Sequence, residues 1–212
     1  IVALPDSFGA LTSLRELFLS ENRLSMLPAS IGALRNLETL HLAENELVAL
    51  PDEIGALTGL KELNLGGNRL SALPDTFAQL TSLESLGILY NAFTTLPASI
   101  GALVHLKHLW AYGNALTALP DELAALTSLV ELNVGDNALA SPLSDALGAL
   151  TRLERLFLFK NDLTVLPEVL TVMPALQIVS VTGNPRLVAP QSAPLVALFE
   201  RLRSVRAQRG GG

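Results

Sequence analysis

Residues 37–57 read LETLHLAENELVALPDEIGAL, and this stretch decides the fold. Its leucines, its asparagine and its proline recur at the same spacing along the chain. The asparagine stands at positions 22, 45, 68, 91, 114, 137, 161 and 184, so successive copies are 23 residues apart, with one interval of 24. Proline follows six residues after most copies; in the longer repeat Ser144 takes that place and Pro142 lies in the insertion. Such a period is the signature of a repeat architecture.

Each fixed position of the repeat has a physical role. Apolar residues alternate in the Leu-x-Leu segment, which predicts a short strand with one buried face. A single short strand cannot bury that face, so successive repeats must stack into a parallel sheet over a leucine core. The asparagine amide can bind backbone groups where the chain leaves the sheet. The proline can open a short helical turn on the way back. Because this return is longer than the strand, we expect a curved array with the sheet inside.

The full pattern, LxxLxLxxNxLxxLPxxIGxLxx, resembles the leucine-rich repeat family, in the 23-residue LPxxIGxL style of intracellular and bacterial members. The resemblance extends over residues 1–190, which make about eight repeats with a truncated N-terminal one. It implies an α/β solenoid, with a parallel sheet on the concave face and short helical turns on the convex face. It also implies a binding module that takes protein partners on the concave face.

The C-terminal end departs from the repeat. Residues 191–209 carry Leu195, Leu198, Phe199, Leu202 and Val205 on one helical face, which predicts an amphipathic helix that caps the last repeat. A helix lying on a membrane surface is the alternative interpretation. Residues 210–212 are three glycines and are expected to form a flexible tail.

Composition and charge exclude several classes of protein. Leucine supplies 48 of 212 residues and half of the chain is hydrophobic, which excludes intrinsic disorder. Without cysteine there is no disulfide scaffold or Cys-ligated metal site. Residues 1–184 hold 19 acidic and 9 basic residues, which disfavours nucleic acid as a partner. The basic residues near the C-terminus fit a solvated helix face better than a binding patch.

The same composition gives expectations about location. No stretch makes a credible membrane span. The missing cysteines favour a reducing, intracellular compartment. We therefore expect a cytoplasmic monomer, or an effector delivered into a host cell. The alanine-rich sequence suggests a bacterial source.

No catalytic motif is found. The chain has no P-loop, GxGxxG, GxSxG or HExxH pattern. His105 and His108 are close in sequence, but one is expected in a loop and the other on a strand. The acidic pair Asp52-Glu53 follows a repeat proline, where the dipole of a helical turn favours negative charge. We therefore expect neither catalysis nor a metal or cofactor in this chain.

A partner-binding surface is predicted where the strands point outward. Of ten aromatic residues, Phe8, Phe77, Phe93 and Phe199 fall at core positions, and the other six map to the concave face. Exposed aromatic residues at this density favour a protein interface over the alternative, a solvated sheet that merely carries them. The predicted partner-binding residues are Phe18, His41, Leu89, Tyr90, His108, Trp110, Tyr112, Asn133, Phe157, Phe159 and Lys160.

Five of the aromatic residues are expected to form a slot. Strands are spaced by about 4.8 Å, so the walls Trp110/Tyr112 and Phe157/Phe159 should stand about 10 Å apart. Asn133 and Gly135 on the strand between them would make the floor. The slot could hold an extended peptide or a helix. Acidic side chains share this face, so the partner is expected to be apolar with some basic character. The acidic residues are Glu16, Glu21, Glu44, Glu62, Glu131 and Asp136.

Two other functional classes compete with a free-standing interaction module. The chain could be the substrate-recognition part of a larger enzyme, such as a bacterial effector ubiquitin ligase or a kinase or GTPase that carries these repeats. It could also be an engineered scaffold, which its varied outward positions disfavour.

Overall fold

The computed structural model describes residues 1–140, 142–188 and 192–200. Within that part of the chain, eight three-residue strands alternate with eight five-residue 3-10 turns. The strands are β1 (Glu16–Phe18), β2 (Thr39–His41), β3 (Glu62–Asn64), β4 (Ser85–Gly87), β5 (His108–Trp110), β6 (Glu131–Asn133), β7 (Arg155–Phe157) and β8 (Ile178–Ser180). The turns are η1 (Asp6–Ala10), η2 (Ala29–Ala33), η3 (Asp52–Ala56), η4 (Asp75–Gln79), η5 (Ala98–Ala102), η6 (Asp121–Ala125), η7 (Asp145–Ala149) and η8 (Glu168–Val172).

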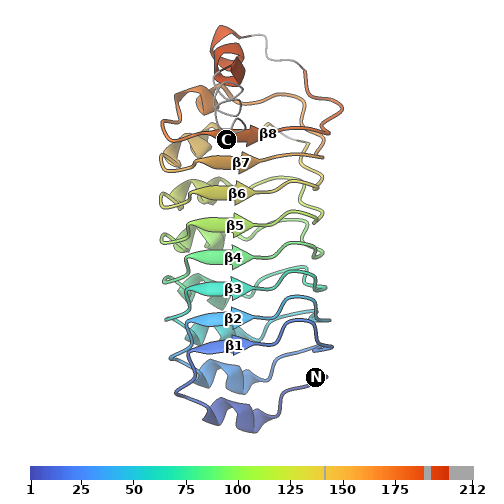
Figure 1. The fold of residues 1–212 in the computed structure, drawn as a ribbon, viewed down its shortest axis with the longest axis vertical. Helices are drawn as coiled ribbons and strands as arrows, with labels where there is room; N and C mark the ends of the chain where they lie inside the picture. Colours follow the sequence, from blue (N-terminus) through green and yellow to red (C-terminus); the bar gives the residue numbers. More distant parts are fainter. Residues whose placement is uncertain (141, 189–191, 201–212) are drawn as a thin grey trace, which may run out of the picture.

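The strands form one parallel sheet in chain order, stacked along the long axis of the molecule (Figure 1). The central leucine of each strand lies opposite its counterparts, as Leu40 does between Leu17 and Leu63. The register survives the one longer repeat, where Leu132 still pairs with Leu156. The extra residue is therefore absorbed outside the strands, and the predicted curved solenoid with a parallel sheet is confirmed.

The helical turns are 3-10 and begin one residue after the repeat proline, slightly later than expected. Pro51 has φ −70° and extended ψ, and its carbonyl accepts a hydrogen bond from the Ile54 N–H at 3.0 Å. Proline suits this cap because its ring holds φ near the required value. Where Ser144 replaces proline, its carbonyl accepts the Leu147 N–H at 3.2 Å, and its side chain also accepts the Ala146 N–H at 3.2 Å.

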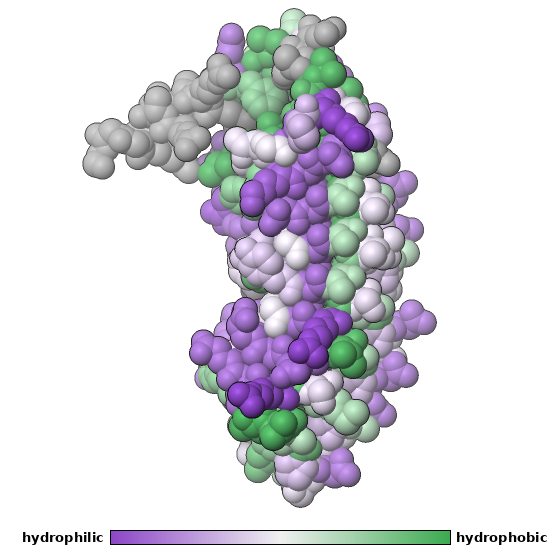
Figure 2. Space-filling model, turned by 90° about the vertical axis from the view of Figure 1, so that its right-hand side faces the viewer, coloured by the Kyte–Doolittle hydropathy of each residue, from purple (hydrophilic) through white to green (hydrophobic). Residues whose placement is uncertain are grey.

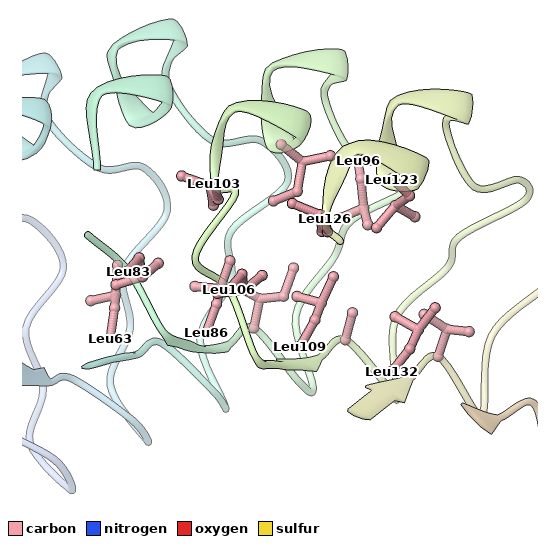
Figure 3. Close-up of a cluster of buried hydrophobic side chains, with 14 of the residues drawn as sticks. Leu63, Leu83, Leu86, Leu96, Leu103, Leu106, Leu109, Leu123, Leu126 and Leu132 are labelled. Carbon is pink, nitrogen blue, oxygen red and sulfur yellow. The ribbon is translucent and has the colours of Figure 1, made fainter. Parts of the chain in front are cut away.

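The core is a continuous column of leucine side chains between the strands and the 3-10 turns (Figure 3). Leucines of the strands, such as Leu86 and Leu109, face leucines of the return segment, such as Leu103 and Leu126 (Figure 3). Phe77 and Phe93 are fully buried in this column, as the sequence predicts. Phe8 and Phe199 pack partly buried against it. Each repeat thus buries its apolar face only against its neighbours.

The glycine of the repeat lets neighbouring turns approach closely. A Cβ atom at Gly32 would lie 2.7 Å from the Glu53 carbonyl oxygen, within the backbone of the next repeat. Glycine is therefore required there by contact between backbones, and its φ is not positive.

The regular spacing of asparagine along the chain has a direct structural cause. The Asn68 carboxamide oxygen accepts the Leu47 N–H at 3.0 Å, and its Nδ2 donates to the carbonyls of Leu42 and Leu65 at 2.9 Å each. One side chain thus binds the backbone of its own repeat and of the preceding one. The other asparagines of the series from Asn45 to Asn184 make the same set of bonds.

Charged side chains beside the sheet form a second ladder. Arg15, Glu38, Lys61, Glu84 and Lys107 occupy equivalent places before successive strands and alternate in sign. Glu38 forms ion pairs with Arg15 and with Lys61, and Glu84 forms one with Lys107. Hydrogen bonds from Lys61 and then Arg15 lower the pKa of the Glu38 carboxyl, and a hydrogen bond from Lys107 lowers that of Glu84. These carboxylates are already satisfied within the protein.

Residues 193–200 at the C-terminal end are helical. Leu195 and Leu198 are buried and join the leucine core, and Phe199 packs against it. Leu202 and Val205 of the predicted capping helix, and the tail 210–212, lie outside the described residues. That the whole segment 191–209 acts as a cap stays a prediction.

Replacing Asn68 with alanine should lower the free energy of unfolding by about 3 kcal/mol, because it leaves buried backbone groups of two repeats unsatisfied. Urea denaturation followed by circular dichroism measures the change. Asn36 is the matched control, since it is exposed and makes one hydrogen bond, to the Thr12 carbonyl at 2.8 Å. If N68A and N36A lose equal stability, the ladder does not hold the repeats together.

Candidate functional site

The candidate site is the concave face, made by the outward residues of β1–β8 and the residues that follow each strand. In every strand the central residue points into the core, and its two neighbours point outward. The sequence-predicted partner-binding residues all lie in these strands or in the turns after them. Figure 2 views the side of the solenoid where the strands end and shows hydrophilic side chains in two groups, below and above a paler stretch over the middle repeats. Hydropathy therefore varies along the solenoid on this side.

The N-terminal part of the face carries an exposed phenylalanine. Phe18 is 61% exposed, and its ring lies edge-on against His41 with the ring centroids 5.1 Å apart. His41 Nε2 lies 2.9 Å from the Glu62 carboxylate, so this side chain is held on both sides. The registers of β1, β2 and β3 place the three residues within reach of each other.

Tyr90 and Tyr112 form the edge of the aromatic cluster. Their rings meet edge-to-face at 5.1 Å. Tyr90 is 54% exposed and has φ +50°, a left-handed conformation that its counterparts Gly67 and Gly113 adopt without cost. For a tyrosine this conformation costs about 1–2 kcal/mol. Its ring covers Gly113, where a side chain would collide with it. A strained backbone therefore presents this ring to solvent.

Trp110 is fixed by a network across three strands. Its ring stacks on the His108 ring, with the ring centroids 5.6 Å apart. Its Nε1 donates to a carboxylate oxygen of Glu131 at 2.7 Å. The other oxygen of Glu131 lies 2.7 Å from Arg155 Nε, an ion pair whose geometry is not that of a hydrogen bond, and the Glu131 side chain is only 16% exposed. The His108 Nδ1 is buried and has no hydrogen-bond partner among the described residues. The network holds the indole in one orientation.

Glu131 and Arg155 help to fix Trp110, a role that the sequence did not reveal. Glu131 was predicted only to share the concave face with the other acids, but its carboxylate contacts Trp110 and Arg155. The strand register places His108, Glu131 and Arg155 side by side on β5, β6 and β7. The equivalent positions of these residues in the repeats could therefore have predicted the contact, once the register was known.

The predicted slot is partly closed. Trp110, Asn133 and Phe157 lie opposite one another on β5, β6 and β7, as expected of two walls and a floor. However, the Phe159 ring lies directly over Gly135, so that part of the floor is covered. Because glycine has no side chain, the neighbouring ring leans into the vacant space. The Phe159 ring thus occupies part of the space expected for the slot, and Asn133 remains between Trp110 and Phe157.

The remaining predicted residues lie around this cluster. Leu89 packs beside Gly66, where a Cβ atom would be 2.9 Å from its Cγ. Asn133 accepts a hydrogen bond from the Gly135 N–H at 3.2 Å. Lys160 is exposed, and its Nζ lies 3.7 Å from Asp136 Oδ1.

Residues 1–140, 142–188 and 192–200 contain no group of three His, Cys, Asp or Glu that could hold a metal ion. In the same part of the chain, no helix has the length and hydropathy needed to cross a membrane. His105 lies in the turn before β5 and His108 within it.

Burial raises the pKa of the Tyr112 phenol, and the adjacent Tyr90 adds to the shift. The unfolded chain should therefore release this proton first, near pH 10, and the free energy of unfolding should fall as pH rises above that value. Denaturation across the alkaline range measures the slope, and Y112F should reduce it. An unchanged slope in Y112F would contradict the assignment to Tyr112.

Known proteins resemble this chain in sequence and fold. The family described as "Leucine-rich repeat region" matches residues 5–95. A search of curated proteins finds no significant match. A leucine-rich repeat protein of Leptospira interrogans is 32% identical, with a TM-score of 0.69 over 89% of this chain and 54% of its own length.

Two plant receptors are also similar. The ectodomain of the Arabidopsis thaliana membrane receptor kinase GASSHO1/SCHENGEN3 is 27% identical, with a TM-score of 0.83 over 92% of this chain and 24% of its own. The plant peptide hormone receptor RGFR1 is 25% identical, with a TM-score of 0.69 over 89% of this chain and 37% of its own. The chain thus spans about half the length of the Leptospira protein and less of either receptor. Residues 5–95 thus belong to the leucine-rich repeat family, and the described chain has the fold of leucine-rich repeat proteins.

Proposed function

We propose that this chain is a non-catalytic protein-interaction module that binds a protein or peptide on its concave face. Two similar structures are of receptors in complex with ligands: GASSHO1/SCHENGEN3 with CASPARIAN STRIP INTEGRITY FACTOR 2, and RGFR1 with RGF2. They support a binding role for this fold. The aromatic cluster of this chain supports the concave face as the location of the binding site.

The observation that carries the proposal is the aromatic cluster over β4–β7. Its members are Tyr90, Trp110, Tyr112, Phe157 and Phe159. Leaving such rings in water is unfavourable, and Trp and Tyr are frequent anchors of interfaces. The contacts of Trp110 with His108 and Glu131 order its ring before any partner arrives. A preordered anchor loses less entropy on binding, which favours affinity.

The partner-binding residues predicted from the sequence stay a prediction and are part of this proposal. The partner is expected to be an apolar segment with basic character. Binding of nucleic acid or membrane is not expected, nor is self-association. An intracellular, bacterial setting and the LPxxIGxL type likewise remain interpretations of the composition and the repeat.

The alternative is that the chain is the recognition part of a larger enzyme. The similar proteins are longer than this chain, and one of them is described as a membrane receptor kinase. In that case the concave face would select the substrate or ligand, and the chemistry would lie in another domain. The same surface variants test both possibilities, because both place recognition on the concave face.

The double variant W110A/F157A should abolish capture of a partner protein from cell lysate, because it removes two anchors of the aromatic cluster. Affinity capture read by mass spectrometry compares it with the wild-type chain, after circular dichroism shows that both fold alike. Loss of the large rings should weaken binding by at least about a hundredfold, since interface anchors contribute about 2 kcal/mol or more each.

The matched control is V48A/V172A, which trims two apolar side chains that are 59% and 74% exposed outside the concave strands. This variant should capture the same proteins as the wild type. Equal capture by W110A/F157A and the wild type would place the binding site elsewhere and refute the proposal.

A further inference from the structure

We infer that the concave face selects an extended peptide with a basic residue about four positions from an apolar anchor, an inference that rests on the proposed function. The basic residue would lie over β1 and β2 and the anchor over the aromatic cluster. The evidence is that carboxylates without an ion pair lie over the first two repeats, beside the exposed Phe18, whereas the acids of the aromatic cluster over β4–β7 are paired.

The acidic zone consists of Glu16, Glu21 and Glu44. All three are exposed, and none makes an ion pair or a side-chain hydrogen bond with any described residue. Glu62 beside them is held by His41. Arg23 follows the asparagine turn nearby and forms no ion pair with them. A cationic side chain would therefore meet carboxylates that have no partner within the described chain.

Two other basic side chains near this zone are already engaged. Arg15 and Lys61 precede β1 and β3, and both bind Glu38. No Lys or Arg occupies an outward position of β1–β4. The negative potential of the acidic zone is thus not cancelled from within the concave face, and a basic partner segment is complementary to it.

The aromatic zone is different because its acids are paired. Glu131 is bound by Trp110 and Arg155, and Asp136 lies 3.7 Å from the Lys160 ammonium. A basic residue placed here would find no unpaired carboxylate to compensate for its lost hydration. An apolar side chain, in contrast, would cover the exposed Tyr90 ring and the half-buried rings beside it. The two zones therefore favour different residues of one ligand.

The strand between the two zones carries small residues. No large side chain projects from the outward positions of β4, which are occupied by Ser85 and Gly87. The glycines beside it are covered, because a Cβ atom at Gly66 would lie 2.9 Å from Leu89 Cγ and the Glu44 carboxylate lies over Gly67. A ligand would therefore rest on Leu89 and Glu44 here while its side chains reach both zones.

The spacing of the strands sets the spacing in the ligand. Glu44 follows β2 and Tyr112 follows β5, so three strand steps in register separate them, or about 14 Å at about 4.8 Å each. An extended peptide rises about 3.3 Å per residue, so about four residues span the distance. A helix rises about 1.5 Å per residue and would need about nine. The spacing in a real ligand thus distinguishes the two conformations.

A random dodecapeptide library displayed on phage and selected on the full chain tests this inference. Enriched peptides should carry Lys or Arg about four positions from an aromatic or aliphatic residue. Fluorescence anisotropy then measures the affinity of the labelled peptides. The variant E16Q/E21Q/E44Q should bind them about tenfold more weakly, as expected from losing several exposed ion pairs.

The matched control is D52N/E53Q/D75N, which removes three exposed carboxylates from η3 and η4 on the convex side. It should bind the peptides as the wild type does. Equal affinity for E16Q/E21Q/E44Q and this control, or enriched peptides without a basic residue, would overturn the inference. If the basic residue and the apolar anchor of the enriched peptides are about nine positions apart, the ligand is helical and the inference of an extended peptide is wrong. Peptides that bind W110A/F157A as well as wild type would refute the proposed function instead.

Discussion

The asparagine amide that joins each repeat to the one before it is the contact on which the rest of the structure depends. A three-residue strand is too short to persist alone, so each repeat is stable only against its neighbours. The residue before every asparagine is left-handed, including the non-glycine residues Glu21, Glu44, Tyr90, Asp136 and Lys160. The hydrogen bonds of the asparagine carboxamide hold the chain in this unfavourable left-handed bend and bring the next strand into register.

The constant backbone makes the outward face a rigid platform whose chemistry can vary. Two large rings lie over a glycine of a neighbouring repeat, Tyr90 over Gly113 and Phe159 over Gly135. Each ring gains contact area from the missing side chain beside it. The backbone strain at Tyr90 thus serves to present a ring at the edge of the cluster, and it is tolerated because the neighbouring repeats hold that turn.

Charged side chains also pair between neighbouring repeats. Along the ladder beside the strands, the signs alternate and each carboxylate is satisfied by a base one repeat away. On the concave face the acids of the middle repeats are also paired, whereas Glu16, Glu21 and Glu44 are not. Two parts of one sheet therefore differ in what they can bind, although their backbones are alike.

The sequence by itself determined the repeat, the strands, the leucine core and the face on which the aromatic residues lie. Periodicity suffices for this, because it states which side of the backbone each residue occupies. It did not reveal that Glu131 fixes Trp110, or that Phe159 covers Gly135 and closes part of the expected slot. Those facts depend on which way a side chain leans across to the next strand. Only the tertiary structure decides this, because residues 21 to 24 positions apart in the chain compete there for the same space.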